Sequence, residues 1–485
     1  MAADQEMQHI GAEAASFIVV ANRLPIDAVV EDDGQVDWTE APGGLVSALA
    51  PVLHGREAVW IGWSGVAADT HPDPVVPPAK MGSYHLVDVP LSTDMVQLYY
   101  EGFSNSTLWP LYHDRIVAPE YHRDTWNSYV DVNLQFAEKA AEVAAPGAIV
   151  WVHDYQLQLV PSMLRALRPD LRIGFYLHIP FPPAELFLQL PWRQRIVEGL
   201  LGADLVGFQT PFGASNFCEV TSLLLGHDFD FDANDGGWID VASPRRVQVD
   251  AFPISIDVAS LSELAATPRV QARAKQIRHE LGDPQHFLLG VDRMDYTKGI
   301  HVRLRAFVEL LEDRMLDPAT TVMLQIATPS REQVEEYQKL REEIELLVGR
   351  AAGAFGEIGE VPLRYMYSGL PHEELAAFYV AADVMLVTPF RDGMNLVAKE
   401  YVACQVDDNG SLVLSEFAGA ALELPQAWLV NPHSLESVKE TIMTAIGTTP
   451  DDRRRRMAAM RAYLSEHDVA RWAREFLEAL EDTRP

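Results

Sequence analysis

Short, continuous hydrophobic runs recur along the chain, separated by stretches in which apolar and polar positions follow a helical period. The runs are FIVVA (17–21), AIVWV (148–152), IGFYL (173–177), LVGF (205–208), FLLGV (287–291), VMLQI (322–326), VMLVT (384–388) and LVL (412–414). Runs of this kind are typical of strands buried on both faces of a parallel sheet. The intervening stretches, such as SMLRALR and QVEEYQKLREEIELLV, have polar faces typical of helices that cover a sheet. The pattern predicts an α/β fold with doubly wound sheets.

Chain length indicates how these elements are grouped. A chain of 485 residues is longer than one hydrophobic core supports, so we expect two domains. The break is expected near 253–260, after the strand-like VQVDAF, which gives domains over 17–255 and 256–455. Residues 1–16 lack the basic start and apolar centre of a signal peptide and are expected to be a disordered lead-in. The charged, helical segment 456–485 is expected to pack back on the first domain.

Composition and charge narrow the classes of partner. No apolar run reaches the roughly 20 residues of a membrane span. The net charge of −32, from 70 acidic and 38 basic residues, disfavours nucleic acid and anionic membranes as partners. The two cysteines, Cys218 and Cys404, lie in helix-like segments and are expected to be buried thiols of a cytoplasmic protein. No Cys/His zinc spacing occurs in the sequence.

Polar residues follow six of the predicted strands directly. They are Asn22–Arg23, His153–Asp154, His178, Asp292–Arg293 with Asp295 and Lys298, the segment 328–331, and the segment 389–395. Any one of these would ordinarily be a helix N-cap or a solvated loop. Because ligands bind beyond the carboxyl ends of parallel strands, six such ends together predict a cleft between two sheets.

Two bases after one strand, Arg293 and Lys298, suit a diphosphate, since arginine offers a planar fork of donors and lysine a point charge. The alternative is a surface salt bridge with Asp292 or Asp295. Two further cations at strand ends could hold a second, separate phosphate: Arg23 and Arg331.

The segment RDGMNLVAKE (391–400) combines a turn with a helix start. Gly393 permits close approach of the backbone to a ligand, and the free N–H groups at the helix start form an anion site. Asp392 could accept hydrogen bonds from sugar hydroxyls, and Glu400, on a similar side of the helix, could accept them from a ribose. Alternatively, Asp392 is a helix N-cap and Glu400 is a surface acid paired with a base.

Aromatic residues in loop-like contexts of the first domain offer faces on which sugar rings pack, although ordinary core burial is the alternative for each. They are Trp63, Tyr99, Tyr100 and Trp109. The glycine pair ending at Gly44 is typical of a turn that opens a helix and could contact an anion or a sugar.

Other sequence patterns exclude rival activities. The Asp-x-Asp of HDFDFD (227–232) precedes an Asp/Gly-rich loop, and we interpret it as a solvated turn rather than a metal site. No G-x-G-x-x-G follows a strand, which argues against nicotinamide dehydrogenases and epimerases. No nucleophile elbow or P-loop is present.

The motifs taken together resemble the trehalose-6-phosphate synthase family, from about residue 17 to about 475. They are NRLP, GGL, WIGWSG, YYEGFSNSTLWP, WVHDYQL, GFYLHIPFP, GFQT, VDRMDYTKG, ATPSR, LVTPFRDGMNLVAKEY and LSEFAGA. The resemblance implies two Rossmann-like domains facing a deep cleft, the GT-B fold. It implies a retaining transfer of glucose from a nucleotide-glucose to glucose 6-phosphate, without metal or cofactor.

The resemblance also implies site residues, position by position. The residues implied at the reaction centre are Arg293, Lys298, Asp154, His178 and Asp392. The donor would be bound by Arg293, Lys298, His178, Asp392, Gly393, Met394, Asn395, Leu396, Val397 and Glu400. The acceptor would be bound by Arg23, Gly44, Trp63, Tyr100, Trp109, Asp154 and Arg331. Tyr100 is chosen over Tyr99 for its spacing to Trp109.

One departure from the family pattern lies at LPHEEL (370–375), which has no arginine where the family can place a donor contact. The family also implies a homo-oligomer, a dimer or tetramer, in the cytoplasm. Two alternatives stay open: a relative with another phosphorylated acceptor, such as glycerol 3-phosphate, and a sugar-phosphate sensor without activity. The sensor reading predicts loss of Arg293, Lys298, Asp392 or Glu400, and all four are present.

Overall fold

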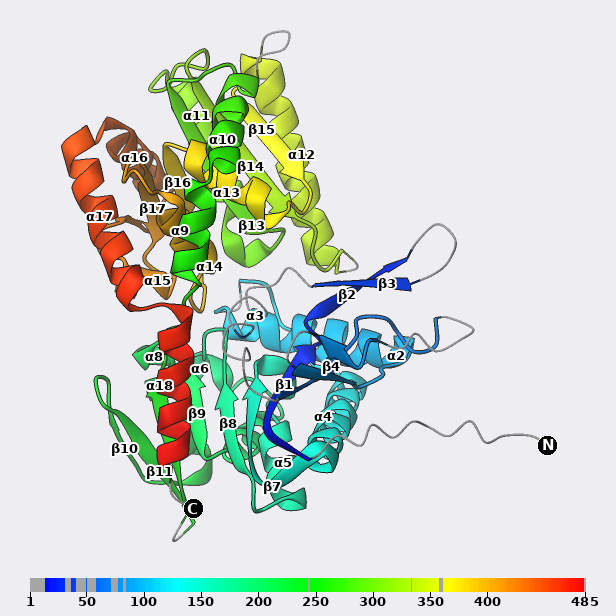
Figure 1. Cartoon of the computed structure of the whole chain (residues 1–485). Coiled ribbons are helices and arrows are strands. Elements are labelled where there is room, and N and C mark those ends of the chain that lie inside the picture. The colour runs from blue at the N-terminus through cyan, green and yellow to red at the C-terminus, as the bar shows by residue number, and fades with distance from the viewer. Residues whose placement is uncertain are drawn as a thin grey trace.

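The chain forms two α/β lobes stacked end to end (Figure 1). The computed structural model describes residues 14–30, 36–40, 49, 58–70, 77–81, 84–114, 116–242, 245–332, 334–356 and 361–483. Within these ranges, no helix is long and apolar enough to cross a membrane.

The first lobe is built on a sheet that, within the described residues, has ten strands in the order β10-β11-β12-β9-β8-β7-β1-β4-β6-β5. The strands are β1 Ala15–Arg23, β4 Ala58–Trp63, β5 Lys80–Met81, β6 Tyr84–Asp88, β7 Ala144–His153, β8 Arg172–Tyr176, β9 Leu205–Phe208, β10 Phe229–Asp232, β11 Gly236–Ala242 and β12 Arg245–Ala251. The central strands β12-β9-β8-β7-β1-β4-β6 are parallel to one another. The order in which the chain adds strands reverses between β1 and β7. Ligands bind at such a switch point, so the residues after β1 and β7 are well placed.

The second lobe has a wholly parallel sheet, six strands among the described residues, in the order β15-β14-β13-β16-β17-β18. The strands are β13 His286–Arg293, β14 Thr321–Thr328, β15 Leu363–Tyr367, β16 Val384–Val387, β17 Ser411–Ser415 and β18 Trp428–Val430. This is the Rossmann order, and its switch point lies between β13 and β16.

Helices cover both sheets. In the first lobe they are α2 Thr93–Met95, the π-helix η1 Val96–Leu108, α3 Trp109–Tyr112, α4 Arg123–Val143, η2 Tyr155–Leu157, α5 Val160–Leu167, α6 Ala184–Phe187, α7 Arg193–Leu200 and α8 Pro211–Leu225. In the second they are α9 Val258–Ala266, α10 Pro268–Glu280, η3 Tyr296–Lys298, α11 Ile300–Glu312, α12 Glu335–Phe355, α13 His372–Ala381, α14 Leu396–Cys404, α15 Ala420–Glu423 and α16 Leu435–Gly447. A separate ribbon pairs β2 Ile26–Val30 with β3 Val36–Glu40.

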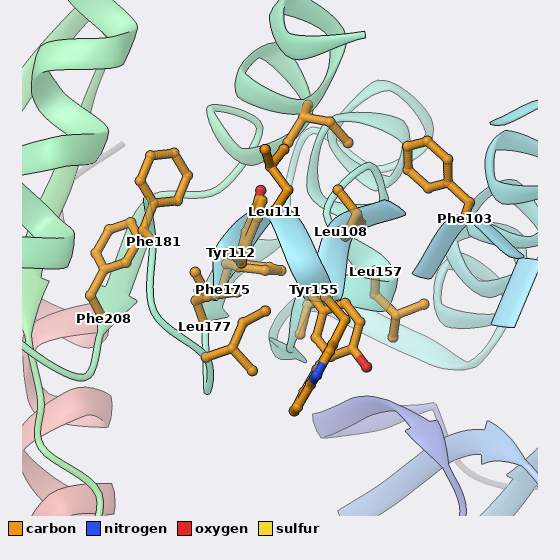
Figure 2. Close-up of a cluster of buried hydrophobic side chains, with 14 of the residues drawn as sticks. Phe103, Leu108, Leu111, Tyr112, Tyr155, Leu157, Phe175, Leu177, Phe181 and Phe208 are labelled. Carbon is orange, nitrogen blue, oxygen red and sulfur yellow. The ribbon is translucent and has the colours of Figure 1, made fainter. Parts of the chain in front are cut away.

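The core of the first lobe lies directly beneath the segment that carries its predicted aromatic ligands. Leu108, Leu111 and Tyr112 are fully buried against Phe175 and Leu177 of the sheet (Figure 2). Removing these apolar surfaces from water is favourable and holds η1 and α3 against the ends of β7 and β8.

The eight apolar runs are all strands, which confirms the predicted architecture. Two expectations need correction. HDFDFD is not a turn: β10 covers Phe229–Asp232 and pairs with β11, because the Phe-Asp alternation has the two-residue period of a strand. The first strand begins at Ala15, inside the predicted lead-in of 1–16, whose first 13 residues lie outside the described ranges.

Two chain segments pass between the lobes side by side. The first follows β12, and the second joins α17 Pro450–Glu466 to α18 Val469–Asp482; the Val469 amide donates to the Ile256 carbonyl at 3.1 Å. α17 lies along the second lobe and α18 along the first (Figure 1). On α18, Phe476 stacks on Trp151 of β7, with ring centroids 4.6 Å apart. The domain limits at 255 and 455 stay predictions.

Candidate active site

The switch points of the two sheets face each other across the junction of the lobes. Arg331, which follows β14, donates from Nη2 to the Tyr155 hydroxyl of the first lobe at 3.0 Å. Its guanidinium lies 3.9 Å from the centre of the Trp109 ring. Gly393 packs against the His178 carbonyl so closely that a Cβ there would clash with the oxygen. The structure therefore brings the predicted donor and acceptor residues to one place.

The loop after β13 is held from below by an arginine that sequence reasoning missed. Arg303 of α11 is fully buried. It donates to the Asp292 carboxylate, to Gln325 Oε1 at 2.9 Å, and to the Lys298 carbonyl and Thr388 Oγ1, both at 3.1 Å. Because the Arg303 guanidinium donates to four different acceptors, it holds the backbone of the loop after β13 in place. Nothing in the sequence marks Arg303, because it lies one turn into a helix rather than at a strand end.

The Lys298 side chain reaches from the loop after β13 to Asp392, in the turn that precedes α14. Its Nζ lies 2.7 Å from Asp392 Oδ2, and both side chains are nearly buried. Burial raises the pKa of Asp392, but the Lys298 ammonium, with the charge of His113 and the hydrogen bond from Asn395, together hold the pKa below its usual value. The pair is therefore ionised, and the ammonium keeps further donors for a phosphate.

Arg293 is the exposed cation of the loop. Within the described residues it makes no hydrogen bond or ion pair, and its guanidinium lies 5.7 Å from the Trp109 ring. The alternative of a salt bridge with Asp292 or Asp295 is wrong, since Asp292 pairs with Arg303 and Asp295 lies 3.6 Å from Arg331. The Arg293 charge still lowers the pKa of Asp295 and of Asp154, so it acts on both carboxylates without pairing with either.

The turn before α14 opens a helix as predicted, and its geometry excludes the alternative that Asp392 is the N-cap. The N-cap is Asn395, at φ +81°, whose side chain accepts from the Ala398 amide at 3.0 Å. Asp392 is therefore not the cap; it accepts from Asn395 Nδ2 at 3.0 Å. Met394 is buried, while Leu396 and Val397 are partly exposed at the first helical turn. The N–H groups at the start of a helix are suited to binding an anion, which is what the sequence predicts for this turn.

Glu400 lies one turn further along α14. Its carboxylate accepts from the Tyr379 hydroxyl at 2.9 Å, and burial raises its pKa. Among the described residues it has no salt bridge, so the alternative of a paired surface acid is wrong. His372, the first residue of α13, lowers the pKa of Glu400 electrostatically. It lies in the stretch that lacks the family's arginine.

Several of the residues predicted to bind the acceptor lie near Arg331. Its side chain is 6% exposed, with Asp295 Oδ2 at 3.6 Å and Trp109 against its face. Tyr100 lies edge-on to Trp63, with ring centroids 6.1 Å apart, and is half-buried.

Tyr99 is a core residue: it is fully buried and donates to Asn22 Oδ1 at 2.8 Å. Choosing Tyr100 over it agrees with this geometry. Arg23 lies 5.2 Å from the Trp63 ring and pairs with Asp27 at 2.7 Å. Gly44 lies outside the described residues.

Asp154 and His178 follow neighbouring strands and contact each other. The His178 amide donates to Asp154 Oδ1 at 3.1 Å, and Asp154 has φ +75°. Burial raises the pKa of Asp154 to about 6 and lowers the pKa of His178 to about 3. A neutral imidazole and a carboxylate that titrates near neutrality therefore lie where the lobes meet.

One more histidine escaped the sequence reasoning. His113, after α3, is buried, and its Nδ1 lies 2.8 Å from the Trp109 carbonyl oxygen. Burial lowers the pKa of His113 to about 4. The Lys298 charge lowers this pKa as well, whereas the Asp392 charge raises it. It follows a helix rather than a strand, so the search of strand ends did not find it. The described residues contain no group of three or more His, Cys, Asp or Glu that could hold a metal.

Comparison with known proteins agrees with this site. The family model of glycosyltransferase family 20 matches residues 15–482. Trehalose-6-phosphate synthase of Mycolicibacterium gilvum (strain PYR-GCK) is 58% identical over 480 residues, covering 97% of this chain and 94% of the relative. That of Mycolicibacterium smegmatis is 57% identical over 474 residues, covering 97% and 93%.

Solved structures share the whole architecture. A UDP-forming α,α-trehalose-phosphate synthase from Burkholderia xenovorans in complex with glucose-6-phosphate is 34% identical, with a TM-score of 0.87 over 96% of this chain and 99% of that one. An E. coli structure bound with UDP-2-fluoro glucose is 33% identical, with a TM-score of 0.86 and the same coverage. The likeness confirms the predicted GT-B fold and a glycosyltransferase. The chain belongs to glycosyltransferase family 20.

Proposed function

We propose that this chain transfers glucose from a nucleotide-glucose to glucose 6-phosphate, with retention at the anomeric carbon, giving trehalose 6-phosphate and a nucleoside diphosphate. The observation that carries the proposal is that cations of the second lobe meet aromatic residues of the first lobe at one junction. Lys298 and Arg293 belong to the switch point of the second sheet, while Arg331 and Arg23 lie beside the aromatic residues of the first lobe.

On the donor side, Arg293 and Lys298 hold the diphosphate and the N–H groups of residues 393–397 support it. Asp392 and His178 contact the transferred glucose, and Glu400 accepts from the ribose hydroxyls. The bound analogue of the E. coli relative, UDP-2-fluoro glucose, supports a nucleotide-sugar as the donor.

On the acceptor side, Arg331 and Arg23 hold the phosphate of glucose 6-phosphate. Trp63, Tyr100 and Trp109 pack on or beside the sugar, and Asp154 accepts from its hydroxyls. Gly44 is included in the acceptor site on the basis of the sequence motif alone. The Burkholderia relative in complex with glucose-6-phosphate supports this acceptor.

The proposed chemistry is a front-face substitution. The bond from the anomeric carbon to the diphosphate oxygen breaks, the acceptor hydroxyl oxygen bonds to the same face of that carbon, and its proton moves to the leaving phosphate. Lys298 and Arg293 stabilise the charge that develops on the diphosphate, which is the role that preorganised cations serve best. The proposal includes no metal and no cofactor.

A pH dependence follows from the environment of Asp154. Its pKa is raised to about 6 by burial, so the carboxylate gains a proton as the pH falls through 6. A protonated carboxyl accepts sugar hydroxyl protons less well, so kcat/KM for the acceptor is expected to fall tenfold per pH unit below that value. Asp154→Asn is expected to lose most activity and this acidic limb together. An unchanged limb in that variant would assign the titration to another group.

Two other readings are weaker. A family member with glycerol 3-phosphate as acceptor would use the same arginines, and competition between acceptors separates it. A sensor without activity has no need of the four donor-side residues that this chain keeps, namely Arg293, Lys298, Asp392 and Glu400.

The deciding experiment mixes the protein with UDP-, ADP- or GDP-glucose and glucose 6-phosphate in EDTA and follows the sugars by proton NMR. An α,α-linked disaccharide phosphate is the expected product, and the fastest donor identifies the base. Nucleotide release without disaccharide would overturn the acceptor. The predicted homo-oligomer, a dimer or tetramer, is measured on the same sample by light scattering, and the predicted cytoplasmic location by fractionation.

A further inference from the structure

His178 is held at its backbone from three sides. Its amide donates to Asp154 Oδ1, its carbonyl accepts from Gln209 Nε2 at 3.3 Å, and Gly393 of the other lobe packs against the same carbonyl. None of these contacts involves the imidazole ring, which packs against Tyr176 and Trp472, with ring centroids 4.7 and 6.3 Å apart. Packing on apolar ring faces does not select between the two neutral tautomers.

A second histidine, His153, contacts the His178 ring and has no part in the reaction proposed above. His153 is the last residue of β7, is 0% exposed, and places Nδ1 3.1 Å from His178 Nε2. Its other ring nitrogen, Nε2, is buried and has no hydrogen-bond partner within the described part of the chain. The one polar contact of the His153 ring in those residues is therefore the contact to His178.

The aromatic surroundings leave His153 little freedom. Its ring lies 4.7 Å from that of Trp151, and Trp151 is stacked on Phe476 of the C-terminal helix α18. Burial lowers the pKa of His153 well below its usual value and that of His178 to about 3, so both rings are neutral. In a contact between two neutral imidazoles one nitrogen donates and the other accepts. The protonation of one ring consequently decides that of the other.

We propose that His153 is a positioning residue that fixes the orientation of the His178 ring and couples the tautomer of that ring to its own. Nδ1 of His178 then meets the donor glucose in one orientation, and it carries the proton whenever His153 Nδ1 donates to His178 Nε2. The catalytic consequence rests on the proposed contact between His178 and the donor sugar. The pairing itself does not.

Three substitutions at one position test this. The side-chain amide of His153→Asn reaches the place of Nδ1 and can turn to donate or accept, whereas the amide of His153→Gln reaches the place of Nε2. His153→Leu keeps the bulk and removes the hydrogen bond. Since one neutral hydrogen bond corresponds to roughly 2- to 12-fold, kcat is expected to fall about that much in the Leu and Gln variants. It is expected to recover in the Asn variant, while KM for glucose 6-phosphate stays unchanged in all three.

A merely structural role would lower stability in all three variants without this order of kcat values, so thermal unfolding is measured beside the kinetics. Selective ¹⁵N-histidine labelling, with His178→Asn to assign the signals, reads the tautomer directly. The His178 ring signals are expected to change in His153→Leu and to keep their wild-type pattern in His153→Asn.

Three outcomes would overturn the proposal, each in a different part. Unchanged His178 ring signals in folded His153→Leu would refute the pairing. Asn turnover as low as Leu turnover would refute the hydrogen bond as the cause. Wild-type turnover in His178→Ala would refute the donor-sugar contact of the proposed function, and the ring signals would still report the pairing.

Discussion

Lys298→Ala is expected to lower kcat by at least roughly 10- to 150-fold, the range of one charge-assisted hydrogen bond of about 1.5–3 kcal/mol lost in the transition state. Lys298 is the nearly buried cation that pairs with Asp392 at 2.7 Å and faces the proposed diphosphate. Because its charge is needed most when the leaving group departs, kcat should fall together with kcat/KM. Steady-state kinetics with the best donor measure both.

The same substitution leaves Asp392 buried without its ion-pair partner, which destabilises a fold by about 3–5 kcal/mol when a pair is fully buried. Arg293→Ala avoids this difficulty, since Arg293 is exposed and unpaired within the described residues, and it should lower turnover while unfolding stays as in wild type. Lys439→Ala, which breaks ion pairs between α16 and the C-terminal end of α11, is the matched control. Wild-type turnover in folded Lys298→Ala and Arg293→Ala would end the leaving-group role.

Arg331→Ala is expected to raise KM for glucose 6-phosphate by roughly 10- to 150-fold and to change kcat less, because it removes a charge-assisted bond to the acceptor phosphate in ground and transition state alike. Arg331 is held by the Tyr155 hydroxyl and the Trp109 face, so its fork is fixed before the acceptor binds. Arg331→Lys keeps the charge without the fork and should lie between the two.

Arg341→Ala is the matched control for this position. Arg341 also lies over an aromatic ring, that of Tyr367 at 4.2 Å, but on the outer helix α12. An unchanged KM for glucose 6-phosphate in Arg331→Ala, with the protein folded, would move the acceptor phosphate to other residues. Titration of the acceptor at saturating donor gives the constant directly.

Strand ends carried most of the site prediction. Asp154, His178, Arg293 and Asp392 each follow a buried apolar run, and a parallel sheet gathers such positions at one edge whatever the details of packing. Arg303 and His113 were missed for the complementary reason: one lies within a helix and the other after a short one. Both residues matter because of their tertiary contacts, and tertiary contacts cannot be read from the local sequence.

The eight central strands, the two-sheet architecture and the cations at the strand ends could be predicted from the amino-acid sequence, because apolar runs and local turn signals act over a few residues. The partner of each charged side chain could not be predicted, because it depends on how distant segments pack. Lys298 pairs with Asp392, 94 residues away, and Asp292 with Arg303 rather than with its neighbour Arg293. Such choices depend on burial, where an unpaired charge is costly, and burial is decided only when distant segments pack. The same holds for the pairing of His153 with His178: the register of two adjacent parallel strands sets His153 opposite Tyr176, two residues before His178.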